Sequence, residues 1–139
     1  MKKLIYAILL VASASIFAYR GQAQVLVIAN PSVKSAEASK GDLRDIFTGN
    51  SSSLKGSQVT PVLLKGGAAH DAFLSAYIGK PDGAFRAGWR SLVFSGQASM
   101  PKSVDSEAAM VDYVAHTPGA IGYVSSGAPH EGVKVLAVR

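Results

Sequence analysis

A proline followed by a glycine separates a helical pattern from an apolar run near the end of the chain. Residues 117–124 read Thr-Pro-Gly-Ala-Ile-Gly-Tyr-Val. Proline lacks a backbone N–H and glycine tolerates positive φ, so Pro118 and Gly119 are expected to end the preceding helix. The apolar residues that follow predict a buried strand, in which Gly122 permits close approach of another backbone. A helix, a stop and a buried strand in succession predict an α/β fold.

The N-terminus has the pattern of a secretory signal peptide. Two lysines precede an uncharged apolar run at 4–18, and small residues at Gly21 and Ala23 suit a signal peptidase. The run is shorter than the roughly 20 residues of a membrane-spanning helix, which favours cleavage over a transmembrane anchor. We therefore expect a signal peptide over 1–23 with cleavage after Ala23, one mature domain over 24–139, and a periplasmic location.

The charge balance changes when the predicted leader is set aside. The full chain has 14 basic and 9 acidic residues, and Lys2, Lys3 and Arg20 lie in the leader, which leaves 11 basic residues against 9 acidic ones. No basic run with interleaved aromatic residues remains, so nucleic-acid binding is not expected. The chain has no cysteine, which excludes disulfides, thiolate metal sites and a lipidated N-terminal cysteine.

Strands and helices are predicted to alternate along the mature chain. Strands are expected at 25–29, 59–64, 120–124 and 133–138, and helices at 39–48, 69–78, 81–93 and 105–116. Pro61 suggests that its strand lies at a sheet edge or contains a bulge. Trp89 and Phe94 are expected in the core. The alternation predicts a central sheet flanked by helices.

Three phrases carry a resemblance to a known family. They are Asp-Leu-Arg-Asp-Ile-Phe-Thr-Gly at 42–49, Ala-Phe-Leu at 72–74, and the segment 117–124 described above. In this order they resemble the phosphate-type periplasmic substrate-binding proteins, and in particular short, single-lobe relatives of the phosphate ABC transporter's binding protein. The likeness extends over essentially the whole mature chain. It implies a single lobe of the type II periplasmic-binding-protein fold and a non-enzymatic function; in full-length members, two such lobes close over an anion.

The first candidate site is the turn between the second strand and the second helix. Gly66 and Gly67 allow backbone N–H groups to converge, the helix start adds partial positive charge, and Lys65 adds a full charge. In phosphate-binding relatives this turn carries an arginine, an acidic residue and a Gly-Ser-Gly-Thr run whose hydroxyls bond phosphate. Here Ala68 and Ala69 stand where hydroxyls would help. An anion site and a plain strand-to-helix turn both remain open.

Polar residues at two strand ends form the second candidate site. Ligands collect at the carboxyl ends of strands in open α/β sheets, so Asn30 and Ser32 could donate to an oxyanion there. The same two side chains could instead only cap a turn. Tyr123, Ser125 and Ser126, at the end of a later strand, leave the same two readings open.

A third candidate is a row of charged residues on one predicted helix. Asp82, Arg86 and Arg90 are spaced four apart, so two guanidinium groups could grip a phosphate or an acidic partner. An exposed charge ladder is the favoured interpretation. The three histidines show no metal-ligand spacing, so neither a metal nor another cofactor is expected.

Two functions of different classes follow from these observations. The first is a secreted solute-binding protein that holds a phosphate-like oxyanion on the N–H groups of Gly67, Ala68 and Ala69, helped by Asn30 or Ser32. One lobe leaves the anion half hydrated, so we expect weak binding by the monomer, with a homodimer as one way to supply a second lobe. The second is a ligand-free periplasmic interaction or regulatory module that serves a membrane permease or sensor.

Overall fold

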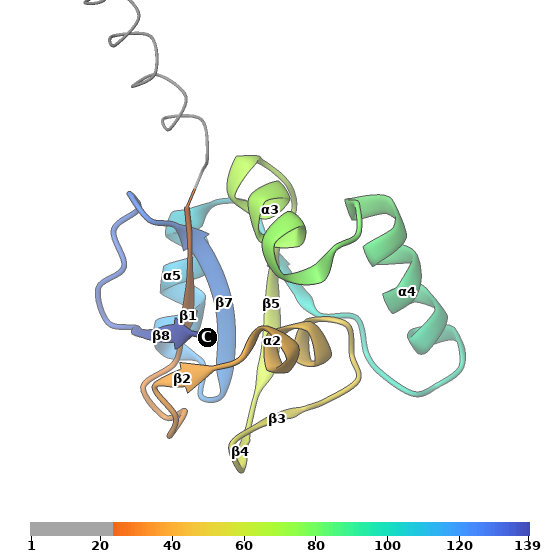
Figure 1. Cartoon of the computed structure of the whole chain (residues 1–139), viewed down its shortest axis with the longest axis horizontal. Coiled ribbons are helices and arrows are strands. Elements are labelled where there is room, and N and C mark those ends of the chain that lie inside the picture. The colour runs from red at the N-terminus through yellow and green to blue at the C-terminus, as the bar shows by residue number, and fades with distance from the viewer. Residues whose placement is uncertain (1–23) are drawn as a thin grey trace, which may run out of the picture.

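A six-stranded mixed sheet forms the centre of the molecule (Figure 1). The computed structural model describes residues 24–139, and the predicted signal peptide lies outside them. The strand order is β2-β8-β1-β7-β5-β6, with a separate β3-β4 hairpin. The strands are β1 (Val25–Ala29), β2 (Glu37–Ala38), β3 (Ser53–Leu54), β4 (Ser57–Gln58), β5 (Thr60–Leu64), β6 (Lys102–Val104), β7 (Ala120–Ser125) and β8 (Lys134–Val138).

Strand direction decides which loops meet at each end of the sheet. β5 runs parallel to both β6 and β7, whereas β1 runs antiparallel to both β7 and β8. The carboxyl ends of β5, β6 and β7 therefore lie together at one end of the sheet. The carboxyl end of β1 lies at the other end, because Ala29 pairs with Ile121 near the start of β7.

Helices cover both faces of the sheet, as the sequence predicted (Figure 1). They are α2 (Lys40–Phe47), α3 (Ala68–Phe73), the π-helical turn η2 (Leu74–Ile78), α4 (Asp82–Phe94) and α5 (Glu107–His116). Gly122 faces α5, where a Cβ atom would lie 2.5 Å from the Met110 sulfur. The next residue, Tyr123, points to the opposite face and contacts His70 and Phe73 of α3. Alternation along β7 thus separates the two helical layers.

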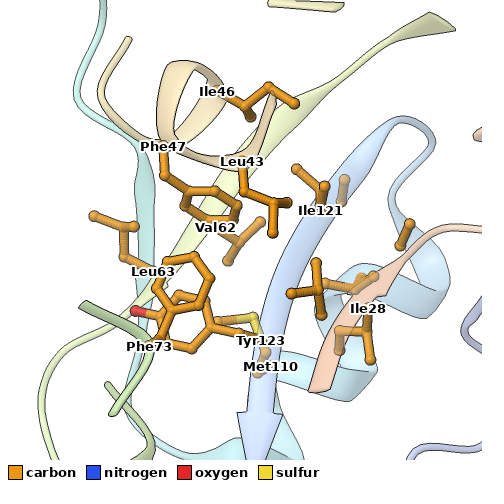
Figure 2. Packing of buried hydrophobic residues seen from close by; sticks show 14 of the residues in the cluster. Ile28, Leu43, Ile46, Phe47, Val62, Leu63, Phe73, Met110, Ile121 and Tyr123 are labelled. Carbon is orange, nitrogen blue, oxygen red and sulfur yellow. The ribbon is translucent and has the colours of Figure 1, made fainter. Parts of the chain in front are cut away.

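Aromatic side chains fill the core on the α2 and α3 side of the sheet (Figure 2). The rings of Phe73 and Tyr123 stack with centroids 4.0 Å apart, and Phe47 meets Phe73 edge-on at 4.7 Å. Trp89 attaches α4 to this core by donating from Nε1 to the Phe47 carbonyl at 2.8 Å. The prediction of a buried Phe94 is wrong, because this side chain is 96% exposed. Phe94 lies five residues after Trp89, about 140° around the helix from the buried face.

The predicted helix and strand boundaries have clear physical causes. Ser39 caps α2 through a capping box, since its Oγ accepts from the Asp42 N–H and the Asp42 carboxylate accepts from the Ser39 N–H.

The prediction of an edge strand at Pro61 is wrong, because β5 lies between β7 and β6. The Thr60 N–H donates toward β7, so Pro61 faces the side where β6 pairs only from Val62 onward. The missing N–H of Pro61 therefore costs no bond of the sheet.

The helices of this part of the chain are short. Among residues 24–139, none is long and apolar enough to cross a membrane.

Candidate functional site

The glycine turn, residues 65–70, lies where the three parallel strands end. It follows β5 directly and leads into α3. Residues that follow β6 and β7 reach the same place, because all three strands point toward this end of the sheet. Together they line an open hollow of about 270 Å³, formed by Leu64, Gly66, Gly67, Ala68, Ala69, Asp105, Ser106, Glu107 and Ser125. Such an edge of a parallel sheet is where ligands of α/β proteins commonly bind.

The backbone of the turn presents a run of unused donors. Within residues 24–139, no carbonyl or side chain accepts a hydrogen bond from the N–H of Gly66, Gly67, Ala68 or Ala69. Gly67 has φ of 99°, a left-handed conformation that favours glycine. Gly66, Gly67 and Ala68 are exposed. α3 continues directly into η2, so the helical segment behind these amides reaches Ile78. Exposed, unpaired N–H groups at a helix start can bind an anion by donating hydrogen bonds to it.

The charges around the hollow are mixed. The Lys65 ammonium pairs with the Asp105 carboxylate at 2.8 Å, and this pairing holds the pKa of Asp105 below its usual range. Glu107 accepts from the Ser125 N–H at 2.5 Å and from the Ser125 hydroxyl at 3.1 Å. The Glu107 carboxylate therefore already accepts from both donors of Ser125. This leaves the turn amides as the donors available to an external anion.

The structure does not bring Asn30 and Ser32 to the glycine turn. The Asn30 side-chain amide donates to the carbonyls of Val114 and Ala115 at 2.8 and 3.1 Å, and its oxygen accepts from the Ser32 N–H at 2.9 Å. The Ser32 hydroxyl accepts from the Gly119 N–H. Both residues thus lie at the start of β7, whereas the turn follows the end of the parallel strand β5. Their hydrogen bonds agree with the alternative reading, in which these side chains cap local backbone.

The polar residues at the end of β7 are also separated from one another. Ser125 lines the hollow, whereas the Ser126 N–H donates to the Gln24 carbonyl at the start of the described chain. Tyr123 is fully buried, and burial raises the pKa of its hydroxyl well above the ordinary value. Only Ser125 of the three is therefore placed to meet a ligand in the hollow.

A hydrogen-bond chain that begins at two fully buried residues, Tyr123 and His70, runs behind the glycine turn. The Tyr123 hydroxyl accepts from the Leu64 N–H at 3.0 Å and lies 2.5 Å from His70 Nδ1. His70 Nε2 lies 2.6 Å from the Asp82 carboxylate, which also accepts from Arg86 Nε at 2.8 Å. Burial opposes ionisation of Asp82, but the hydrogen bonds from His70 and Arg86 outweigh it, so the pKa of Asp82 lies below its ordinary value. This chain joins β5, α3, α4 and β7.

The charge ladder favoured from the sequence is present in part. Asp82 and Arg86 form the expected ion pair one helical turn apart, but their side chains are only 41% and 20% exposed. The Arg86 guanidinium also donates to the carbonyls of Leu64 and Lys65. Arg90 is exposed, as a ladder residue would be. Sequence spacing could not reveal this arrangement, since Asp82 meets a histidine 12 positions earlier across a π-helical turn. Residues 24–139 contain no group of three metal-binding side chains.

Comparison with solved structures agrees with this architecture. The chain superposes on an ABC-type phosphate transport receptor from Vibrio cholerae with a TM-score of 0.64 and 19% identity, over 84% of this chain and 46% of that one. A putative phosphate ABC transporter substrate-binding protein with bound phosphate, from Clostridium perfringens, gives a TM-score of 0.64 and 17% identity over 84% and 45%. PstS from Borrelia burgdorferi gives 0.56 and 15% over 84% and 47%.

These likenesses are structural, at low sequence identity. No protein-family model and no curated protein matches the chain. The chain spans about half the length of the three solved structures that it resembles. The chain thus has the α/β fold of the substrate-binding proteins of phosphate ABC transporters, with a mixed central sheet between two layers of helices.

Proposed function

We propose that this chain is a secreted, non-enzymatic solute-binding module that holds a phosphate-like oxyanion at the glycine turn. The observation that carries the proposal is the run of amides from Gly66 to Ala69, which have no acceptor among the described residues and of which the first three belong to exposed residues. The structural neighbours named as phosphate receptors support the choice of ligand class. The signal peptide predicted over 1–23 supports export to the periplasm.

The proposed ligand contacts involve fewer residues than the sequence suggested. The N–H groups of Gly67, Ala68 and Ala69 would donate to the oxyanion, and Gly66 would allow its close approach. Lys65 would contribute charge after loosening its pair with Asp105, both of whose side chains are more than half exposed. Asn30 and Ser32 are left out of the proposed site, because their hydrogen bonds are made at the other end of β7.

The affinity of a monomer is expected to be weak, in the millimolar range. The hollow is open to solvent, so the anion keeps part of its hydration and each new hydrogen bond replaces one to water. The carboxylates of Asp105 and Glu107 also oppose an anion. A second copy that closes over the turn would remove the remaining water. A membrane permease is the partner that the names of the neighbours suggest.

Two charge substitutions test the proposed site. Ala68→Asp places a carboxylate on the first residue of α3, where a negative charge suits the helix start, but about 5 Å from a bound anion. Coulomb repulsion at that distance should weaken phosphate binding about tenfold. Ala36→Asp makes the same chemical change at an exposed position beside the edge strand β2 and should leave binding unchanged.

Isothermal titration calorimetry with phosphate and sulfate measures these affinities, on protein expressed from the full-length sequence and shown to be monomeric. Equal affinities for the two variants would place the anion elsewhere. Submillimolar affinity in the monomer would contradict the expected weakness.

One observation favours the second candidate function, a ligand-free interaction or regulatory module. The Glu107 carboxylate accepts from both donors of Ser125, and the Lys65 ammonium is paired with Asp105. Carboxylates of the chain itself therefore pair with several of the groups that could bind an anion in the hollow. An absence of any heat or chemical-shift response to phosphate and sulfate at tens of millimolar would select this function. Saturable binding that Ala68→Asp weakens about tenfold would exclude it.

A further inference from the structure

We propose that Tyr123, His70, Asp82 and Arg86 are positioning residues, which hold the glycine turn in the conformation that presents its amides to a ligand. The inference rests on the proposed function and assigns the hydrogen-bond chain behind the turn to the control of that same site. None of the four side chains needs to touch the ligand. Tyr123 and Arg86 bond directly to Leu64 and Lys65, the two residues from which the turn departs. His70 and Asp82 connect Tyr123 to Arg86.

The hydrogen-bond directions can be worked out from the backbone end. The Leu64 N–H can only donate, so the Tyr123 oxygen accepts from it and the hydroxyl proton points to His70 Nδ1. His70 Nε2 then carries the hydrogen that the Asp82 carboxylate accepts. Every donor in this series has an acceptor, which holds the ring of a fully buried histidine in one tautomer and one orientation.

Arg86 ties the same series to the other side of the turn. Its Nε donates to Asp82, while Nη2 donates to the carbonyls of Leu64 and Lys65 at 3.1 and 3.2 Å. The N–H and C=O groups of Leu64 are thus both held by side chains from other elements. Because Gly66 and Gly67 are themselves permissive, the direction in which their amides point depends on this anchoring of the residues before them.

Loss of one link should loosen the turn and weaken binding together. Tyr123→Phe removes the acceptor of the Leu64 N–H and the donor to His70 while keeping the ring stack with Phe73. We expect lower NMR order parameters at the backbone amides of the turn, and a phosphate dissociation constant raised about three- to tenfold, the range for one lost hydrogen bond. Tyr113→Phe, on a half-buried tyrosine of α5, is the matched control and should change neither quantity.

Rescue separates positioning from simple stabilisation. His70→Leu should behave like Tyr123→Phe, whereas His70→Gln keeps one acceptor and one donor and should recover a large part of both effects. Arg86→Gln provides a milder variant for the case in which core changes prevent folding, because the Arg86 side chain is 20% exposed. Arg90→Gln, at an exposed position of the same helix, is its control.

The experiment is ¹⁵N relaxation of the backbone amides of residues 66–69 by NMR, with phosphate titration of the same samples, on protein expressed from the full-length sequence. Lower order parameters in Tyr123→Phe, His70→Leu and Arg86→Gln with recovery in His70→Gln support the inference. Variants that melt at lower temperature but keep wild-type order parameters in the turn would overturn it. If the wild type binds no phosphate, the proposed function fails, while the relaxation measurement still decides whether these residues position the turn.

Discussion

The substitution Asn30→Asp distinguishes a structural role for this residue from the ligand-binding role that the sequence suggested. It keeps the size of the side chain but replaces the NH₂ donor by a carboxylate oxygen. That oxygen would face the carbonyls of Val114 and Ala115, which now lie 2.8 and 3.1 Å from the amide nitrogen. Two hydrogen bonds are lost and a buried carbonyl keeps no donor.

The expected cost follows from these contacts. Each lost bond contributes about 0.5–1.5 kcal/mol, and the unsatisfied carbonyl adds about 1–3 kcal/mol, so we expect a loss of about 4 kcal/mol in the free energy of unfolding. For a domain of this size, with about 4 °C per kcal/mol, the melting temperature should fall by about 16 °C. Phosphate affinity should not change, because Asn30 lies at the opposite end of the sheet from the glycine turn.

Thermal and urea unfolding followed by circular dichroism measure the first quantity, and calorimetric titration measures the second. Ser32→Ala is the control, since its exposed hydroxyl accepts one hydrogen bond that water can replace; its effect should stay below about 1 kcal/mol. If Asn30→Asp unfolded at the wild-type temperature and lost phosphate affinity, Asn30 would be a ligand residue and the assignment made here would be wrong.

Three further changes test the site and the packing. Asp82→Asn should remove part of the acid sensitivity. The lowered folded pKa of Asp82 stabilises the protein above the unfolded value of about 3.9, and this stabilisation is lost as the pH falls below that value, so the melting temperatures of variant and wild type should converge on acidification. A difference in melting temperature that stays constant on acidification would contradict it. Glu107→Gln should tighten phosphate binding about fivefold in calorimetric titration, because it removes one negative charge from the hollow; unchanged or weaker binding would show that the carboxylate does not oppose the anion. Gly122→Ala should cost about 1–3 kcal/mol in urea unfolding, since its Cβ would lie 2.5 Å from the Met110 sulfur; Gly127→Ala meets no neighbour within 4 Å, and equal stabilities would show that the core gives way.

Local signals in the sequence predicted the helix ends and the sheet. The helix predicted to start at residue 39 begins with Ser39 as its cap. Gly122 does permit a close approach, but by the Met110 and Val114 side chains of α5 rather than by the backbone that was expected. These features depend on neighbours in the chain or on the absence of a side chain, and both can be read from residue types. The alternation of apolar and helical segments likewise predicted a sheet between helices, which the structure shows.

The parts that failed depend on which distant segments meet. Asn30 reaches carbonyls 84 and 85 positions away, and its place at the amino end of β7 follows from the antiparallel pairing of β1, which residue types do not reveal. Asp82 and Arg86 were expected to be exposed, because the sequence does not reveal that His70 of α3 is the partner of Asp82. Glu107 was not singled out at all, because a carboxylate that satisfies Ser125 has no periodic or motif signal.

The central claim is that the amides of the glycine turn receive the anion, and NMR tests it most directly. In ¹H–¹⁵N spectra recorded during a phosphate titration of the monomer, we expect saturable downfield shifts centred on Gly67, Ala68 and Ala69, with half-saturation in the millimolar range. The chemical shifts of amides near Ser32 and Gly119, at the other end of the sheet, should not change. Shifts that are absent from the turn, or that are largest at the opposite end, would contradict the account.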